Sequence, residues 1–125
     1  MREYLFHGKR IDDGVWVEGD FRNTNGMSPY SAFIVTYSNE QYNTVFPESV
    51  GQYTGMNDIG DERIFEGDIM ATAIGGITYH RGVVEFADGA FGLRCADGAA
   101  FFLCFVAGNY KKIGTVFEDA DLLEG

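Results

Sequence analysis

Turn-forming glycines recur at regular intervals through the second half of this chain. The signals lie about ten residues apart, at Gly75-Gly76, Asp88-Gly89, Asp97-Gly98 and Gly108-Asn109. Asp-Gly and Gly-Gly pairs favour the tight turns of β-hairpins, because these turns need positive φ angles. The segments between them are rich in aromatic and β-branched residues, which favour strands. This spacing predicts an antiparallel barrel or sandwich rather than a parallel sheet with crossover helices.

Five strands and one helical turn follow from this spacing. The core of this half is expected to include Val83, Val84 and Phe86. Residues Glu118–Leu123 favour a single helical turn that packs its two leucines, and no longer amphipathic helix is predicted. The predicted strands are Ile69–Ile74, Ile77–Phe86, Phe91–Cys95, Ala100–Val106 and Tyr110–Phe117.

The segment Val50–Ile69 separates two differently built halves. Its glycines mark turns or bulges, because glycine adopts positive φ without penalty, and Asn57, Asp58 and Asp61 favour local turn caps. Residues Ile64–Ile69 predict a strand end, a tight turn and the start of a new strand. A well-capped connector is the simplest interpretation of this block.

The first half predicts a hairpin followed by a buried strand. Asp12–Gly14 is a turn between short strands at 3–7 and 15–21. Trp16, the only tryptophan, is expected to anchor this hairpin on the core rather than to stack on a ligand. The strand Tyr30–Tyr37 is almost continuously apolar, which predicts burial on both faces and makes it a candidate subunit interface.

The chain resembles the YopX family of phage and prophage proteins. The resemblance rests on the blocks VGQYTGMNDIGDERIFEGDI, RGVVEF and KKIGTVFEDADLL and on the opening MREYLFHGKRIDDGVWVEGDF. It implies an all-β fold with a C-terminal SH3-type barrel, homo-oligomeric assembly and a phage setting in a bacterial host cell, and it carries over no catalytic residue. We therefore expect an N-terminal antiparallel β subdomain at residues 1–49, and a connector with the SH3-type barrel at 50–125. The family's central loop is more lysine-rich than Ile59–Glu62, so no charge-based partner is inferred from it.

The charge balance bears on partners and location. Lys and Arg number 9 against 19 Asp and Glu, which gives a formal net charge of −10. Duplex nucleic acid is therefore not an expected partner, since its backbone needs a basic footprint. No apolar stretch approaches the roughly 18 residues that span a membrane, and the opening residues lack the apolar core of a signal peptide. The expected location is the cytoplasm, without membrane contact.

No catalytic or cofactor motif stands out. His7 and His80 have no metal-ligand spacing, and the sequence holds neither a phosphate-binding P-loop nor GxGxxG. If Asp97-Gly98 makes a two-residue turn, Cys95 pairs with Ala100, and Cys104 lies about 13 Å further along the strands. That exceeds disulfide reach, so both cysteines are predicted to be buried free thiols. We expect no enzyme activity, no cofactor and no bound metal.

Two sets of residues remain as weak candidates for binding. The carboxylates Asp58, Asp61, Glu62, Glu66 and Asp68 suggest a Ca²⁺ or Mg²⁺ site, although turn capping explains them more simply because the EF-hand alternation is absent. Ligand or partner contacts are considered at Trp16, Tyr53, His80, Arg81, Arg94 and Lys111.

Three functions fit these observations. The preferred one is a non-enzymatic phage or prophage accessory protein that self-assembles and binds a host or phage protein or a small ligand. The second is an acidic counter-defence or host-directed inhibitor, which covers a basic surface by charge complementarity or captures a nucleotide signal with Arg81, Arg94 or Lys111. A hydrolase or metal enzyme ranks last, because no catalytic constellation is visible in the sequence.

Overall fold

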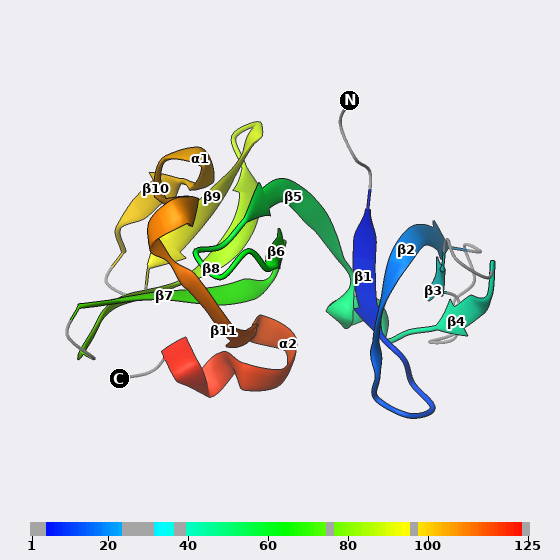
Figure 1. Cartoon of the computed structure of the whole chain (residues 1–125). Coiled ribbons are helices and arrows are strands. Elements are labelled where there is room, and N and C mark those ends of the chain that lie inside the picture. The colour runs from blue at the N-terminus through cyan, green and yellow to red at the C-terminus, as the bar shows by residue number, and fades with distance from the viewer. Residues whose placement is uncertain (1–4, 24–31, 37–39, 75–76, 96–97, 124–125) are drawn as a thin grey trace. The chain divides into compact units, whose positions relative to one another are not determined.

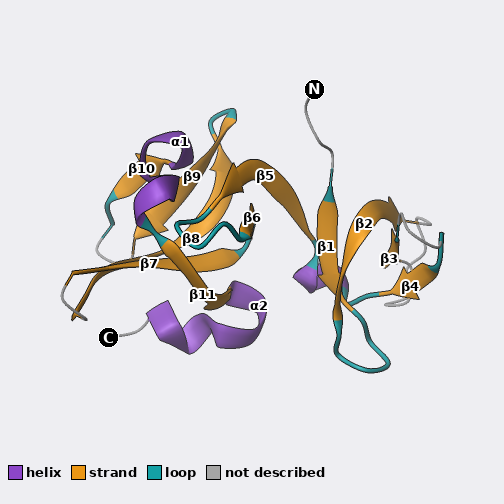
Figure 2. Cartoon of the chain, in the orientation of Figure 1, coloured by secondary structure: helices purple, strands orange, loops and turns teal. Residues whose placement is uncertain are grey.

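The protein is mostly β and divides into two compact units. The computed structural model describes residues 5–23, 32–36, 40–74, 77–95 and 98–123. The first unit covers residues 1–53 and the second covers residues 54–125 (Figure 1). The boundary falls inside one strand, β5 (Gly51–Asn57), which starts in the first unit and ends in the second. The expected all-β class is confirmed, since the described residues form two antiparallel sheets and only short helical segments (Figure 2).

The first unit is an antiparallel sheet in the order β4-β3-β2-β1-β5. Its elements are β1 (Phe6–Lys9), β2 (Trp16–Asn23), β3 (Ala32–Val35), β4 (Tyr42–Thr44), the 3-10 turn η1 (Pro47–Ser49) and the start of β5. Backbone bonds also join the ends of β1 and β4, since Ile11 N donates to Thr44 O at 3.1 Å and Phe46 N to Lys9 O at 2.9 Å.

The predicted buried strand forms the core of this unit. Ile34 and Ala32 on β3 are fully buried with Val45. Since β3 pairs with β2 on one side and β4 on the other, its apolar side chains are covered within the chain itself. The burial predicted for this strand is confirmed for Ala32, Ile34 and Val35, and the predicted role of Tyr30–Tyr37 as a subunit interface stays a prediction.

The second unit contains a five-stranded antiparallel sheet in the order β10-β9-β8-β7-β11. The strands of the second unit, besides the end of β5, are β6 (Arg63–Phe65), β7 (Asp68–Ile74), β8 (Ile77–Ala87), β9 (Ala90–Cys95), β10 (Ala100–Phe102) and β11 (Lys111–Thr115). Its helical segments are α1 (Leu103–Val106), η2 (Ala107–Asn109), α2 (Val116–Asp119) and η3 (Ala120–Leu123). The segments α2 and η3 confirm the helical turn that the sequence predicts at Glu118–Leu123.

Local turn chemistry behaves as the sequence predicts at two places. Asp88 and Gly89 both have positive φ, 54° and 81°, as a type I′ turn between β8 and β9 requires. Gly67, at φ 92°, makes the tight turn between β6 and β7. The predicted turn at Gly75-Gly76 lies outside the described residues.

The strand predicted at Ala100–Val106 is wrong beyond Phe102. The chain turns there into α1 and η2, because Leu103 and Ala107, four residues apart, both reach the core in a helical conformation. Cys104, predicted to be buried, is exposed on α1, whereas Cys95 is buried as expected, and both are free thiols.

Phe86 is also misplaced by the prediction. Val84 is buried in the core, but Phe86 is 52% exposed and packs edge-on against Phe91, with ring centroids 5.1 Å apart. It lies one residue before the end of β8, beyond the core cluster of Ile64, Met70 and Leu93.

Replacement of Gly82 by alanine should destabilise the second unit. A Cβ atom at Gly82 would lie 2.8 Å from Arg94 O and 2.9 Å from Leu93 Cγ, so the β8–β9 pair must shift. We expect a loss of about 2 kcal/mol in urea unfolding. The matched control is Gly108→Ala, where a Cβ meets no atom of the described residues within 4 Å. Equal unfolding midpoints for the two variants would contradict this packing.

Candidate functional site

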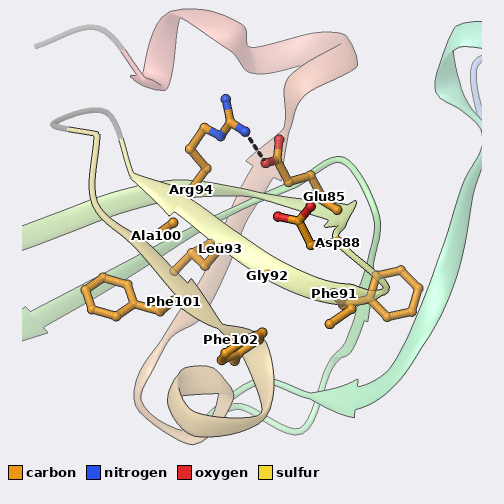
Figure 3. Close-up of a pocket in the computed structure, with 11 residues that line it drawn as sticks. Glu85, Asp88, Phe91, Gly92, Leu93, Arg94, Ala100, Phe101 and Phe102 are labelled. Carbon is orange, nitrogen blue, oxygen red and sulfur yellow. Dashed lines mark ion pairs between the residues drawn. The ribbon is translucent and has the colours of Figure 1, made fainter.

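A shallow groove lies on one face of the β8–β9–β10 hairpins. It has a volume of about 270 Å³, and all of it belongs to the second unit. We call it the β8–β10 groove. It is lined by Glu85, Ala87, Asp88, Ala90, Phe91, Gly92, Leu93, Arg94, Ala100, Phe101 and Phe102 (Figure 3).

The strand register builds the groove. Glu85 on β8 lies opposite Gly92 on β9, and Gly92 lies opposite Phe102 on β10. Because side chains alternate between the faces of a sheet, these three residues form one row on the face away from buried Leu93. Arg94 and Ala100 form the next row on the same face. The row Glu85–Gly92–Phe102 therefore has no side chain at its centre.

The apolar lining is unusually exposed. Phe102, on the short strand β10, is 58% exposed on the groove face. Phe101 is 39% exposed, but it lies opposite Leu93 and so points to the other face of the sheet. Small residues, Ala87, Ala90 and Ala100, line the groove together with Gly92. An exposed aromatic ring beside a small-residue floor forms a surface that an apolar group of a partner can cover.

One ion pair borders this surface. Arg94 Nη2 lies 2.8 Å from Glu85 Oε1, diagonally across the two strands (Figure 3). Asp88 adds an exposed carboxylate at the tip of the β8–β9 turn. With Arg94 neutralised by Glu85, Asp88 leaves the lining with an excess of negative charge.

A second hollow, of about 310 Å³, lies in the first unit. It is lined by Arg10, Ile11, Asp12, Gln41, Tyr42, Asn43 and Thr44. Arg10 contacts the carboxylates of Asp12 at 3.3 Å and Asp13 at 2.8 Å, and its hydrogen bond lowers the pKa of Asp12. The cation of this hollow is thus paired with two local carboxylates, and the lining is mainly polar.

The acidic cluster of the central block is built into turns. Asp58 Oδ1 accepts from Gly60 N at 2.8 Å and Glu62 N at 2.9 Å, while Oδ2 accepts from Lys112 N at 2.9 Å. Burial alone would raise the pKa of Asp58, but these backbone donors outweigh it and lower the pKa. Asp61 accepts from the Asn57 amide at 3.0 Å.

Asp68 is the deeply buried member of this cluster. Its Oδ2 accepts from Phe65 N at 2.7 Å and lies 3.3 Å from Lys112 Nζ, and its Oδ1 has no hydrogen-bond partner among the described residues. Burial raises the pKa of Asp68 to about 6, against the opposing charge of Lys112. Within the described ranges, no three His, Cys, Asp or Glu side chains come together as metal ligands.

The family pattern described as YopX protein matches residues 6–124, nearly the whole chain. The chain belongs to the YopX family. No curated protein matches it. The match to the family pattern confirms the resemblance found in the sequence. In the part of this YopX-family chain that the structure describes, no helix is long and apolar enough to cross a membrane.

The residues proposed from the sequence as ligand contacts lie at separate places. Trp16 packs against buried His7 at 4.6 Å between ring centroids, and Tyr53 is buried, both in the first unit. In the second unit, Arg81 donates to Leu122 O at 2.9 Å, and Lys111 adds a favourable charge interaction to Asp58. His80 is described only by its backbone, opposite Thr72.

Of the candidates whose side chains the structure describes, Arg94 alone lines the β8–β10 groove. Sequence reasoning missed Gly92, Phe101 and Phe102. The signal was the run of apolar residues from Ala100, which the sequence analysis interprets as a single strand, Ala100–Val106. A strand that shows aromatic residues at consecutive positions necessarily points one of them away from the core.

The Asp68 carboxyl should make the folded state less stable at neutral pH than at mildly acidic pH. Its folded-state pKa of about 6 exceeds the ordinary value of 3.8, so the folded protein holds a proton that the unfolded chain releases. This contribution is complete below the unfolded pKa and is lost as pH rises through about 6. The free energy of urea unfolding should fall by about 2 kcal/mol between about pH 4.5 and pH 7.

Asp68→Asn should remove this part of the pH dependence, since asparagine keeps an oxygen that can accept from Phe65 N but does not titrate. The exposed carboxylate of Asp121, replaced by asparagine, is the matched control and should keep the wild-type profile. Parallel pH profiles for wild type and Asp68→Asn would contradict the assignment.

Titration with Ca²⁺ in a calorimeter should give only heat of dilution. Both carboxylate oxygens of Asp58 are occupied by backbone donors, and Asp68 is buried beside Lys112. A cation would have to displace these bonds before it found ligands. A saturable heat with one ion per chain, lost in Asp61→Asn or Glu62→Gln, would restore the metal hypothesis.

Proposed function

We propose that this YopX-family protein is a non-enzymatic accessory protein of a phage or prophage, acting in the cytoplasm of the bacterial host. It self-assembles and binds a protein or small ligand. The β8–β10 groove is the binding surface in this proposal. The observation that carries it is the 58% exposure of Phe102 beside a floor of glycine and alanine.

The groups in the groove support binding. Aromatic rings contribute much of the energy of protein interfaces when a partner covers them. The Glu85–Arg94 pair borders the apolar part and can orient a partner without taking part in a reaction. Burial of Phe102 against a partner would remove apolar surface from water at little cost to the fold, since its ring lies outside the core.

We also propose that the second unit is an SH3-type barrel. The support is its strand order, in which the first long strand, β7, pairs with the last, β11. A short helical connection, α1 and η2, lies between β10 and β11. A barrel of this kind gives the β8–β10 hairpins a rigid base on which a binding surface can be held.

The alternative proposal is an acidic inhibitor that covers a basic surface of a host protein. The net charge of −10 favours it, because such charge speeds association with a cationic partner. In its nucleotide-capturing form this proposal needs free cations. Arg94 pairs with Glu85, and Arg81 donates to Leu122 O, so the structure gives more support to a protein partner than to a phosphate.

Native mass spectrometry of the gently purified full chain tests the proposed function. We expect an oligomer, with or without additional bound mass. A ligand-free oligomer supports a structural or protein-binding role, and a fixed extra mass per subunit supports ligand capture. A bare monomer at micromolar concentration contradicts self-assembly, and the acidic inhibitor then becomes the stronger proposal.

A further inference from the structure

We propose that the β8–β10 groove binds an extended, basic segment of a partner protein, which places one large apolar side chain over Gly92. A lysine or arginine of the same segment meets Asp88. This inference rests on the proposed binding function and names the chemistry of the partner. Three observations carry it: the shape of the floor, the position of β10 and the charge of the lining.

The floor accepts a side chain because it lacks one of its own. Gly92 lies between Glu85 on one strand and Phe102 on the other, so the middle of this row is bare backbone. The ring of Phe102 borders one side, and the Glu85–Arg94 pair borders the other (Figure 3). An apolar side chain placed there contacts the aromatic ring and the alkyl stem of Arg94 together.

The size of the groove favours a side chain over a larger ligand. Pockets for cofactors and drug-sized molecules enclose roughly 300–1,000 Å³ and bury most of their ligand. The β8–β10 groove has about 270 Å³ and lies on a sheet face. It suits one or two side chains of a polypeptide whose remaining surface stays outside.

The neighbouring strand favours an extended partner. β10 is the outer strand in the five-stranded order and holds only Ala100–Phe102, all three exposed. Outer strands are common sites for the addition of an extended segment. A segment laid beside β10 presents alternate side chains to the groove face, where Phe102 lies.

The negative charge of the groove lining and of the whole chain favours a basic segment as the partner. Glu85 and Arg94 neutralise each other at 2.8 Å, which leaves Asp88 as the unbalanced charge of the lining. The formal net charge of −10 favours a cationic partner over a second acidic copy at this surface. We therefore assign the groove to a different protein rather than to another subunit.

Fluorescence anisotropy with defined peptides tests this inference. The probe is a labelled twelve-residue peptide of alternating lysine and phenylalanine, mixed with the full-length protein. Two comparison peptides replace either every lysine by glutamate or every phenylalanine by serine. We expect the lysine–phenylalanine peptide to bind on the order of tenfold more tightly than either.

The decisive variants are Phe102→Ser and Asp88→Asn. Phe102→Ser should weaken binding of this peptide on the order of tenfold, and Asp88→Asn about threefold. The matched controls are Ile113→Ser, an exposed apolar residue on β11, and Asp121→Asn, an exposed carboxylate on η3. Both controls should bind like wild type. Circular dichroism and thermal unfolding check that each variant is folded.

The outcomes separate this inference from the proposed function. If Phe102→Ser binds the peptide as wild type does, or if the controls lose as much affinity as the groove variants, the inference is overturned. If a natural partner mass stays bound to Phe102→Ser in native mass spectrometry, the protein is a binding protein that uses another surface. If wild-type protein is a bare monomer that binds no peptide, both proposals fail.

Discussion

The second unit depends on Lys112, which ties its last strand to two turns of the central block. Its backbone N–H donates to Asp58 at 2.9 Å, its ammonium lies 3.3 Å from buried Asp68, and the same ammonium lies 5.5 Å from the ring centroid of Phe65. Lys112 also pairs with Met70 on β7. Lys112 therefore fixes β11 against the turn after β5 and the turn after β6. The carboxylates of Asp58 and Asp68, which the sequence suggests as metal ligands, hold Lys112 in place.

Asp68 shows why a costly buried charge is kept at this point. An unpartnered buried oxygen is unfavourable, and a buried ion pair adds little net stability by itself. The other oxygen, however, accepts from Phe65 N at 2.7 Å and so closes the Gly67 turn in one register. An apolar residue of similar size would fill the space but would leave Phe65 N without this acceptor. The carboxyl thus specifies how β6 meets β7, and the raised pKa is a consequence of that position.

Local chemistry explains which parts of this fold the sequence predicts. Asp88-Gly89 and Gly67 were found because positive φ is a property of a few residues, whatever surrounds them. The helix α1 was missed because an apolar run fits a strand and a helix equally well, and only the distant core decides. The groove was not predicted because the predicted pairing of β9 with β10 differs from the observed pairing by one residue. A two-residue turn pairs Cys95 with Ala100 and puts Phe102 opposite Leu93, on the core side. In the structure Ala100 pairs with Arg94, Cys95 N donates to Ala99 O, and Phe102 faces Gly92.

This register also allows one strand to serve the core and the surface. On β9, Leu93 and Cys95 are buried, whereas Arg94 is exposed and Gly92 lies on the same outer face. Substitution of Arg94 alters the surface presented to a partner without emptying the core, because alternate residues face opposite sides. Gly92 has less freedom, since a Cβ there would lie 3.1 Å from Phe101 O and would also fill the floor of the groove. The groove can therefore change its charge at Arg94, Glu85 and Asp88 while its apolar floor stays fixed by the packing of β9 against β10.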